Sequence, residues 1–123
     1  MANVILDTSF ILSSVRNKLD FFEELSDLGH SVFIPSEVIL EIERIRKSTK
    51  SLKVRSESEL AVKIIKNGKF RKVDCPGKYP DAGIKNYLDL HPDFVLATMD
   101  YDLKKSVKNR KIVIRNRKKL ELQ

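Results

Sequence analysis

The sequence predicts an α/β fold, a three-layer α/β/α sandwich with a central parallel sheet of about five strands. Residues 4–6 and 94–98 are apolar at nearly every position, which is typical of strands buried on both faces. Segments with helical character alternate with these and other short apolar runs, which is the pattern of βαβ units with right-handed crossovers. We expect one domain that spans residues 1–123.

In the first half of the chain we expect strands at residues 3–6 and 31–34, and helices at residues 19–28, 36–47 and 57–66. Residues 7–9 (Asp-Thr-Ser) supply turn and capping groups directly after the first strand. Gly29 is placed to end the first of these helices, and Ser36 to cap the next one. Residues 48–53 are polar and basic, which predicts a flexible connection.

In the second half we expect strands at residues 70–73, 94–98 and 111–114, and helices at residues 81–90 and 102–107. Residues 75–80 are rich in proline and glycine and predict a loop before the first of these helices. Pro92 prevents that helix from continuing. The chain therefore alternates strand and helix to its last predicted strand.

Composition excludes several classes of protein. Cys75 is the only cysteine, so no internal disulfide is possible, and one cysteine with two separated histidines builds no zinc cluster. No apolar run approaches the ~20 residues of a membrane-spanning helix, and no secretory signal is recognisable. We therefore expect a cytoplasmic protein that has no membrane partner.

The basic residues are numerous and unevenly distributed. The net charge is +7 and the isoelectric point is about 9.6, which favours a nucleic-acid partner over the alternative of a solvated surface in a heat-adapted protein. One cluster consists of Arg44, Arg46, Lys47, Lys50, Lys53 and Arg55. A second cluster consists of Lys104, Lys105, Lys108, Arg110, Lys111, Arg115, Arg117, Lys118 and Lys119.

Four acidic residues are predicted to meet at one edge of the sheet. Asp7 and Asp100 follow apolar strands, Asp81 begins a helix, and Glu41 lies at the edge of the apolar stripe of its helix. Each has a purely structural alternative, because the three aspartates suit helix N-caps and Glu41 suits a salt bridge. Their joint placement favours a site for a divalent metal.

Carboxylates and water are the ligands that Mg²⁺ and Mn²⁺ prefer. A bound ion lowers the pKa of a water and neutralises charge on a phosphate, and two ions ~4 Å apart would clamp both the attacking and the leaving oxygen. Ser9 and Thr98 are expected to orient the acids by hydrogen bonds, and Asp102 is an additional candidate ligand.

Four segments in order resemble the motifs of the PIN-domain family of metal-dependent ribonucleases, and the likeness covers essentially the whole chain. The first is Val-Ile-Leu-Asp7-Thr-Ser, the second runs from Ile34 to Ile42 with the family glutamate at Glu41, the third begins at Asp81, and the fourth contains Thr98-Met-Asp100.

The resemblance implies an endoribonuclease that uses Mg²⁺ or Mn²⁺ held by Asp7, Glu41, Asp81 and Asp100. RNA is the implied substrate, and we expect its backbone to contact Arg46, Lys47, Lys104, Lys105, Arg115 and Arg117. Relatives form homodimers, act as toxins held by an antitoxin, or process ribosomal RNA. The basic tail is closer to the branch near the rRNA-processing nucleases, which implies a ribosome-assembly partner.

The third motif departs from the family pattern. Ala82 and Gly83 follow Asp81 where many relatives have a further acid, and Gly83 weakens the helix start by up to ~1 kcal/mol relative to alanine. This departure favours one alternative, a non-catalytic RNA-binding module of a processing complex. A toxin ribonuclease of a toxin–antitoxin pair is a second alternative.

Overall fold

The computed structural model describes residues 1–123 and contains one sheet of six strands in the order β3-β2-β1-β4-β5-β6. The strands are β1 (Asn3–Leu6), β2 (Ser31–Pro35), β3 (Arg71–Val73), β4 (Val95–Ala97), β5 (Lys111–Arg115) and β6 (Lys119–Leu122). The first five are parallel, as predicted, and β6 is antiparallel to β5.

The prediction of about five parallel strands therefore missed one strand, β6, which is antiparallel and forms one edge of the sheet. The chain reverses through Asn116 and Arg117, which adopt positive φ values of 51° and 63°. Neither residue is a glycine, and the four residues of β6 are mostly exposed, so the sequence carries neither a strong turn signal nor a strong apolar run there.

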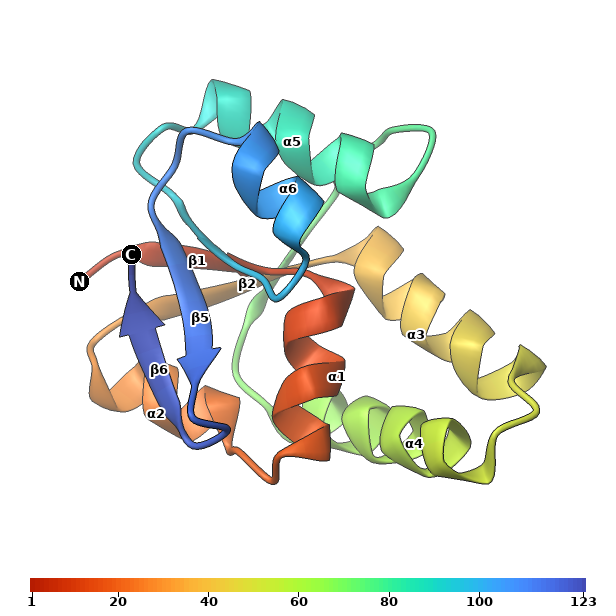
Figure 1. Cartoon of the computed structure of the whole chain (residues 1–123). Helices are drawn as coiled ribbons and strands as arrows, with labels where there is room; N and C mark the ends of the chain where they lie inside the picture. Colours follow the sequence, from red (N-terminus) through yellow and green to blue (C-terminus); the bar gives the residue numbers. More distant parts are fainter.

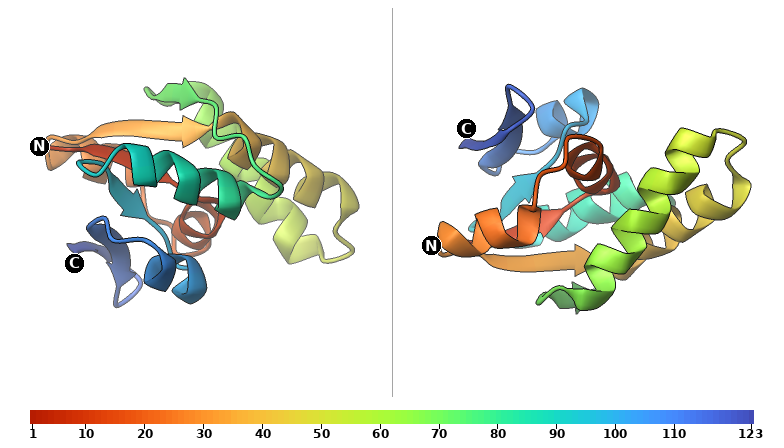
Figure 2. Two further views of the ribbon diagram at one scale, coloured as in Figure 1. Left: turned by 90° about the horizontal axis from the view of Figure 1, so that it is seen from above. Right: turned by 90° about the horizontal axis from the view of Figure 1, so that it is seen from below.

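The helices are α1 (Thr8–Arg16), α2 (Phe21–Asp27), α3 (Ser36–Ser48), α4 (Leu52–Asn67), α5 (Pro80–Leu90) and α6 (Tyr101–Ser106). Figure 1 shows α5 above β1 and β2, with α1, α2 and α4 below them. The views from above and below agree, and they show α3 and α4 side by side as a hairpin that projects beyond the sheet (Figure 2). The predicted α/β/α layers are thus confirmed.

The core is a single cluster of 25 buried apolar residues. Val4, Ile5 and Leu6 of β1 are fully buried because β1 lies at the centre of the sheet and helices cover both faces. The unbroken apolar run that predicted such a strand is therefore explained. Each large side chain buried in this way contributes about 1.5–3 kcal/mol to the free energy of unfolding.

Two segments that we expected to be irregular are helical. Helix α1 begins directly after β1, where we expected turn and capping groups and assigned no helix before residue 19, and α4 begins at Leu52 inside the segment expected to be flexible. Ser51 caps α4 by accepting a hydrogen bond from Val54 N at 3.2 Å. By contrast, Ser36 caps nothing, because its hydroxyl donates instead to Asp74 at 2.7 Å.

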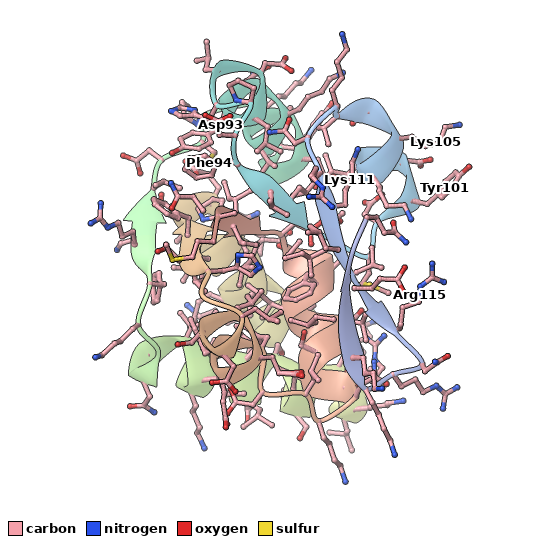
Figure 3. The ribbon with its side chains drawn as sticks, turned by 90° about the vertical axis from the view of Figure 1, so that its left-hand side faces the viewer. Asp93, Phe94, Tyr101, Lys105, Lys111 and Arg115 are labelled. Atoms are coloured by element: carbon pink, nitrogen blue, oxygen red, sulfur yellow. The ribbon has the colours of Figure 1, made fainter.

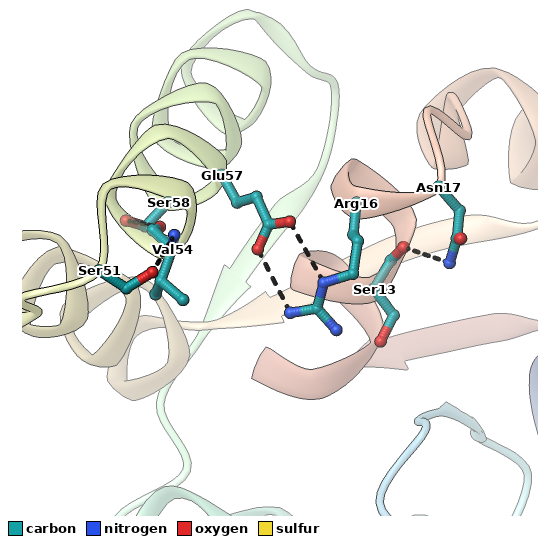
Figure 4. A network of polar contacts seen from close by, with 7 residues as sticks. All are labelled: Ser13, Arg16, Asn17, Ser51, Val54, Glu57 and Ser58. Carbon is teal, nitrogen blue, oxygen red and sulfur yellow. Dashed lines mark hydrogen bonds and ion pairs between the residues drawn. The ribbon is translucent and has the colours of Figure 1, made fainter.

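An ion pair joins α1 to α4 across the lower layer. Arg16 Nε lies 3.2 Å from Glu57 Oε2, and the two side chains face each other in Figure 4. In the same view Asn17 donates to the carbonyl of Ser13, which closes the last turn of α1. The pair is partly exposed, so its net contribution is below about 1 kcal/mol, and apolar packing holds the two helices together.

The start of α5 lies unusually close to the loop that precedes it. A Cβ added to Gly83 would stand 1.8 Å from the carbonyl oxygen of Cys75, so only glycine allows this approach. Glu37 of α3 fixes the same loop by accepting a hydrogen bond from Cys75 N at 3.0 Å. These contacts set the position of the first turn of α5, which carries Asp81.

None of the helices combines the length and the apolar composition that crossing a membrane requires.

Candidate active site

The site lies where β1 and β4 end side by side. Leu6 pairs with Ala97 in the sheet, and Asp7 N donates to the carbonyl of Ala97 at 3.2 Å, so the next residues of both strands emerge at one edge. Asp7 and Asp100 then begin α1 and α6 as N-caps, accepting hydrogen bonds from Phe10 N at 2.8 Å and Leu103 N at 3.0 Å. The capping role and the convergence at the sheet edge therefore occur together.

Two hydroxyl groups connect these strand ends. Ser9 Oγ accepts from Met99 N at 2.9 Å and donates to Asp7 Oδ1 at 2.8 Å. Thr98 Oγ1 accepts from Asp100 N at 3.0 Å and donates to Asp7 Oδ2 at 2.5 Å. Each hydroxyl oxygen accepts a hydrogen bond from a backbone N–H, so its own single proton is directed toward Asp7. The predicted orienting roles of Ser9 and Thr98 thus agree with this geometry.

Asp7 is almost fully enclosed, with only 2% of its surface exposed. Burial raises the pKa of Asp7 to about 6, against the opposing effect of its hydrogen bonds from Thr98, Phe10 and Ser9. The negative charge of Asp81 raises it further. A desolvated carboxylate that remains close to another acid is a group whose charged form a cation would stabilise.

The other three acids approach one another from three different helices. Asp81 is in the first turn of α5, Glu41 is in the middle of α3, and Asp100 begins α6. Partial burial, followed by the negative charges of Asp100 and Glu41, raises the pKa of Asp81 above its ordinary value. Glu41 forms no salt bridge, so the structural alternative for this residue is not realised.

The residues present fit a divalent cation by their chemistry. All four acids offer carboxylate oxygens, the ligands that a hard divalent cation prefers. The charges of Asp100 and Glu41 repel that of Asp81. No lysine or arginine forms an ion pair with any of the four acids. No three acidic, histidine or cysteine side chains are already close enough together to hold one ion. Asp102 is exposed in the first turn of α6 and makes no hydrogen bond.

The basic residues expected to contact RNA fall into two groups. Arg46 and Arg115 are partnered within the protein, each with a 2.9 Å contact to a glutamate, Glu43 and Glu121 respectively. The remaining four have no carboxylate partner: Lys47, Lys104, Lys105 and Arg117. Exposed ion pairs are weak, below about 1 kcal/mol, so a phosphate competes readily for either arginine.

A cleft of about 890 Å³ lies away from the acids, at the amino ends of β2 and β3, between α2 and α4. None of the four acids lines it. Sequence reasoning also missed a second hollow, of about 490 Å³, beside the end of α6. Its signal was present in the sequence as the density of lysines and arginines after Asp102.

The profile of a family described as PIN like domain matches residues 4–119. The chain belongs to the PIN-like domain family. The resemblance seen in the four motifs is therefore confirmed, and the match includes all four acidic residues of the site.

Curated relatives of this PIN-like domain fall into two groups. Ribonuclease VapC4 of Methanocaldococcus jannaschii is 27% identical over 128 residues, which cover 99% of this chain and 97% of that protein. The human rRNA-processing protein FCF1 homolog is 27% identical over 111 residues, which cover 86% of this chain but only 52% of that protein. The chain thus spans about half the length of the rRNA-processing relatives.

Solved structures give the same fold. The PIN domain endonuclease Utp24 superimposes with a TM-score of 0.79 and 25% identity, covering 98% of this chain and 90% of that chain. VapBC2 from Rickettsia felis superimposes with a TM-score of 0.63 at 13% identity, which supports the fold alone.

Proposed function

We propose that this PIN-like domain is an endoribonuclease that hydrolyses RNA phosphodiester bonds with the help of Mg²⁺ or Mn²⁺. Two observations support the proposal: Asp7 and Asp100 follow the adjacent strands β1 and β4, and the charges of Asp100 and Glu41 act on Asp81. None of these acids has a cationic partner. The names of the relatives, a ribonuclease and an endonuclease, support the reaction class.

The four acids would hold the cation. When bound, it neutralises charge on the phosphate and makes a water more acidic. Ser9 and Thr98 keep both oxygens of Asp7 aimed in one direction, which limits the reorganisation needed during the reaction. Asp81, whose pKa is raised, is the most exposed of the acids and is suited to exchange a proton with solvent.

The decisive experiment is cleavage of a fluorescent RNA by the wild type and by Asp100→Asn, with Mn²⁺, with Mg²⁺ and with chelator. Asparagine retains the N-cap acceptor that Leu103 N requires, so α6 should remain folded while the charge is lost. We expect metal-dependent cleavage by the wild type and a loss of at least about 100-fold in the variant, the scale of one electrostatic contact in a reaction.

Asp93→Asn is the matched control, because Asp93 (labelled in Figure 3) is exposed and precedes β4, whereas Asp100 follows it. It should cleave like the wild type. Full cleavage by Asp100→Asn would remove this residue from the site. Salt-sensitive RNA binding without cleavage in any metal would instead favour the non-catalytic RNA-binding module.

Two finer roles follow from the two groups of relatives. The rRNA-processing relatives and the basic tail favour a role in ribosomal RNA maturation with a ribosome-assembly partner. The match to VapC4 over nearly its full length favours a compact ribonuclease, for which an antitoxin partner is the alternative. Incubation with precursor and mature rRNA separates them, because a processing enzyme cuts the precursor at discrete positions. The homodimer and the cytoplasmic location remain predictions.

A further inference from the structure

A hollow of about 490 Å³ lies beside the C-terminal end of α6. Among the residues that line it are five cations, and none is acidic: Lys104, Lys105, Lys108, Arg110 and Lys111. They come from α6, from the segment that follows it, and from the first residue of β5. Six of the seven lining residues lie within residues 104–111, where the chain turns from α6 into β5, and Gln123 after β6 closes the hollow.

These five cations lack acidic partners. The ion pairs of the protein involve Arg16, Arg46 and Arg115, none of which lines the hollow. Within it, Lys111 Nζ donates to the carbonyl of Val107 at 2.7 Å, and Lys104 Nζ donates to Gln123 Oε1 at 3.4 Å. Like charges gathered in this way repel one another, and an anion would relieve the repulsion.

The helix dipole does not account for the whole set. Lys104 and Lys105 occupy the last turn of α6, where each complements the dipole by about 0.3–1 kcal/mol. Lys108, Arg110 and Lys111 lie beyond the end of the helix, where this effect has faded. Lys111 still serves the helix end, because its Nζ donates to the carbonyl of the C-cap Val107. Lys108 and Arg110 have no such role, and a bound anion would account for their position.

The hollow is connected to the carboxylates by α6 itself. Asp100 begins the helix and Lys104 and Lys105 end it, and its six residues span about 9 Å. Tyr101 and Lys105 project from α6 to the same side, with Lys105 Nζ 5.3 Å from the centre of the tyrosine ring (Figure 3). A strand that lies along α6 would therefore reach both the carboxylates and the hollow.

We propose that the hollow binds backbone phosphates of the RNA strand that the carboxylates cut, on the side of the scissile bond toward which α6 points. That the bound strand is the RNA substrate of a nuclease rests on the proposed function. Lys108 and Arg110 are its principal contacts, since they make no side-chain hydrogen bond or ion pair within the protein and remain exposed.

The test is the salt dependence of RNA binding, measured in chelator so that no cleavage occurs. A fluorescent single-stranded RNA is titrated with the wild type and with the double variant Lys108→Ala/Arg110→Ala at several KCl concentrations. Each lost phosphate contact lowers the slope of log Kd against log salt by about 0.7, so the double variant should lose about 1.4. Its folding should be unchanged, because only the main-chain carbonyl of Arg110 bonds within the sheet, to Leu96 N.

The matched control is Lys66→Ala/Lys72→Ala. It removes the same charge from α4 and β3, at the edge of the sheet farthest from β6. It should leave the slope unchanged. Equal slopes in the wild type and the hollow variant, or an equal loss in the control, would overturn the inference.

The alternative ligand of the hollow is a free anion such as inorganic phosphate. Binding of inorganic phosphate that disappears in the hollow variant, with an unchanged RNA slope, would assign the hollow to a free anion and overturn the RNA contact. The proposed function fails separately. If the slope depends on the hollow but no metal supports cleavage, the hollow inference stands and the nuclease does not.

Discussion

Asp7 shows how one residue performs two tasks. Its Oδ1 accepts from Phe10 N and caps α1, while hydroxyl donors from Ser9 and Thr98 reach both of its oxygens. The same hydrogen bonds that start the helix therefore hold the carboxylate in one rotamer. This placement is costly for the metal-free protein, because desolvation raises the pKa of Asp7 to about 6 from an ordinary value of 3.8.

This cost predicts a pH dependence of stability. The folded protein binds the Asp7 proton more tightly than the unfolded chain, so the contribution is fully present below pH 3.8 and is lost as the pH rises through about 6. Asp7→Asn keeps the cap but cannot ionise. Between about pH 4 and pH 8 it should gain about 3 kcal/mol on the wild type, from a shift of about two pKa units.

Urea unfolding of both proteins in chelator measures this difference. The expected curves meet near pH 4, diverge as the pH rises to about 6 and keep a constant difference above it, with the variant more stable. Parallel pH profiles would show that Asp7 ionises in the folded state as readily as in the unfolded chain.

At the scale of the helices and strands, most of the fold could be predicted from the sequence. The buried strands were visible as apolar runs, and Gly29 ends α2 with a positive φ of 83° as expected. Helix α1 was missed because Asp7 and its neighbours have good turn chemistry, and β6 was missed because a three-residue turn without glycine gives little signal. Local propensity describes neither packing nor strand partners.

Strand ends and motif order gave the four candidate site residues, whose roles stay a prediction, whereas the hollow could not be predicted. The lysines and arginines of the tail were visible as a cluster, but which of them face one another depends on the path of the chain after α6. Arg46 and Arg115 seemed equally suited to RNA, and only the fold shows that each has a glutamate partner.

For a substitution at Gly83, helix propensity and packing predict changes in stability of opposite sign. Helix propensity alone predicts that Gly83→Ala stabilises α5 by up to about 1 kcal/mol. Its Cβ, however, would meet the backbone of Cys75 at 1.8 Å, so we expect destabilisation of about 1–3 kcal/mol and weaker cleavage as Asp81 moves. Asn86→Ala, at an exposed position of the same helix, should be neutral or slightly stabilising.

Equilibrium urea unfolding gives the sign of both changes. An increase in stability for Gly83→Ala would mean that the first turn of α5 lies farther from the Cys75 loop than described here.

At the scale of the whole molecule, the charge is divided between two regions. Asp7, Asp100, Glu41 and Asp81 lie within electrostatic range of one another near the carboxyl ends of β1 and β4, while unpartnered cations occupy the hollow at the far end of α6. The overall excess of +7 attracts a polyanion, and the acids prevent its phosphates from binding at the site without a counter-ion. Cation binding and RNA binding are therefore expected to support each other.

This division predicts linkage between metal and stability. A divalent ion that binds only the folded protein should stabilise it by about 2.7 kcal/mol when its concentration is 100 times its Kd. Thermal unfolding should therefore shift upward with Mn²⁺ or Mg²⁺ for the wild type and Asp93→Asn, but not for Asp7→Asn. A similar shift in all three proteins would place the bound ion outside the carboxylate cluster.

The two edges of the sheet also influence how copies of the protein behave in solution. β3 ends one side with three residues, and it presents Arg71 and Lys72 to solvent, while β6 ends the other beside Arg117, Lys118 and Lys119. Any strand that added to either edge from another copy would bring cations against cations. The protein is thereby protected against edge-to-edge aggregation, and it reaches a long polyanion as a dispersed molecule rather than as a fibre.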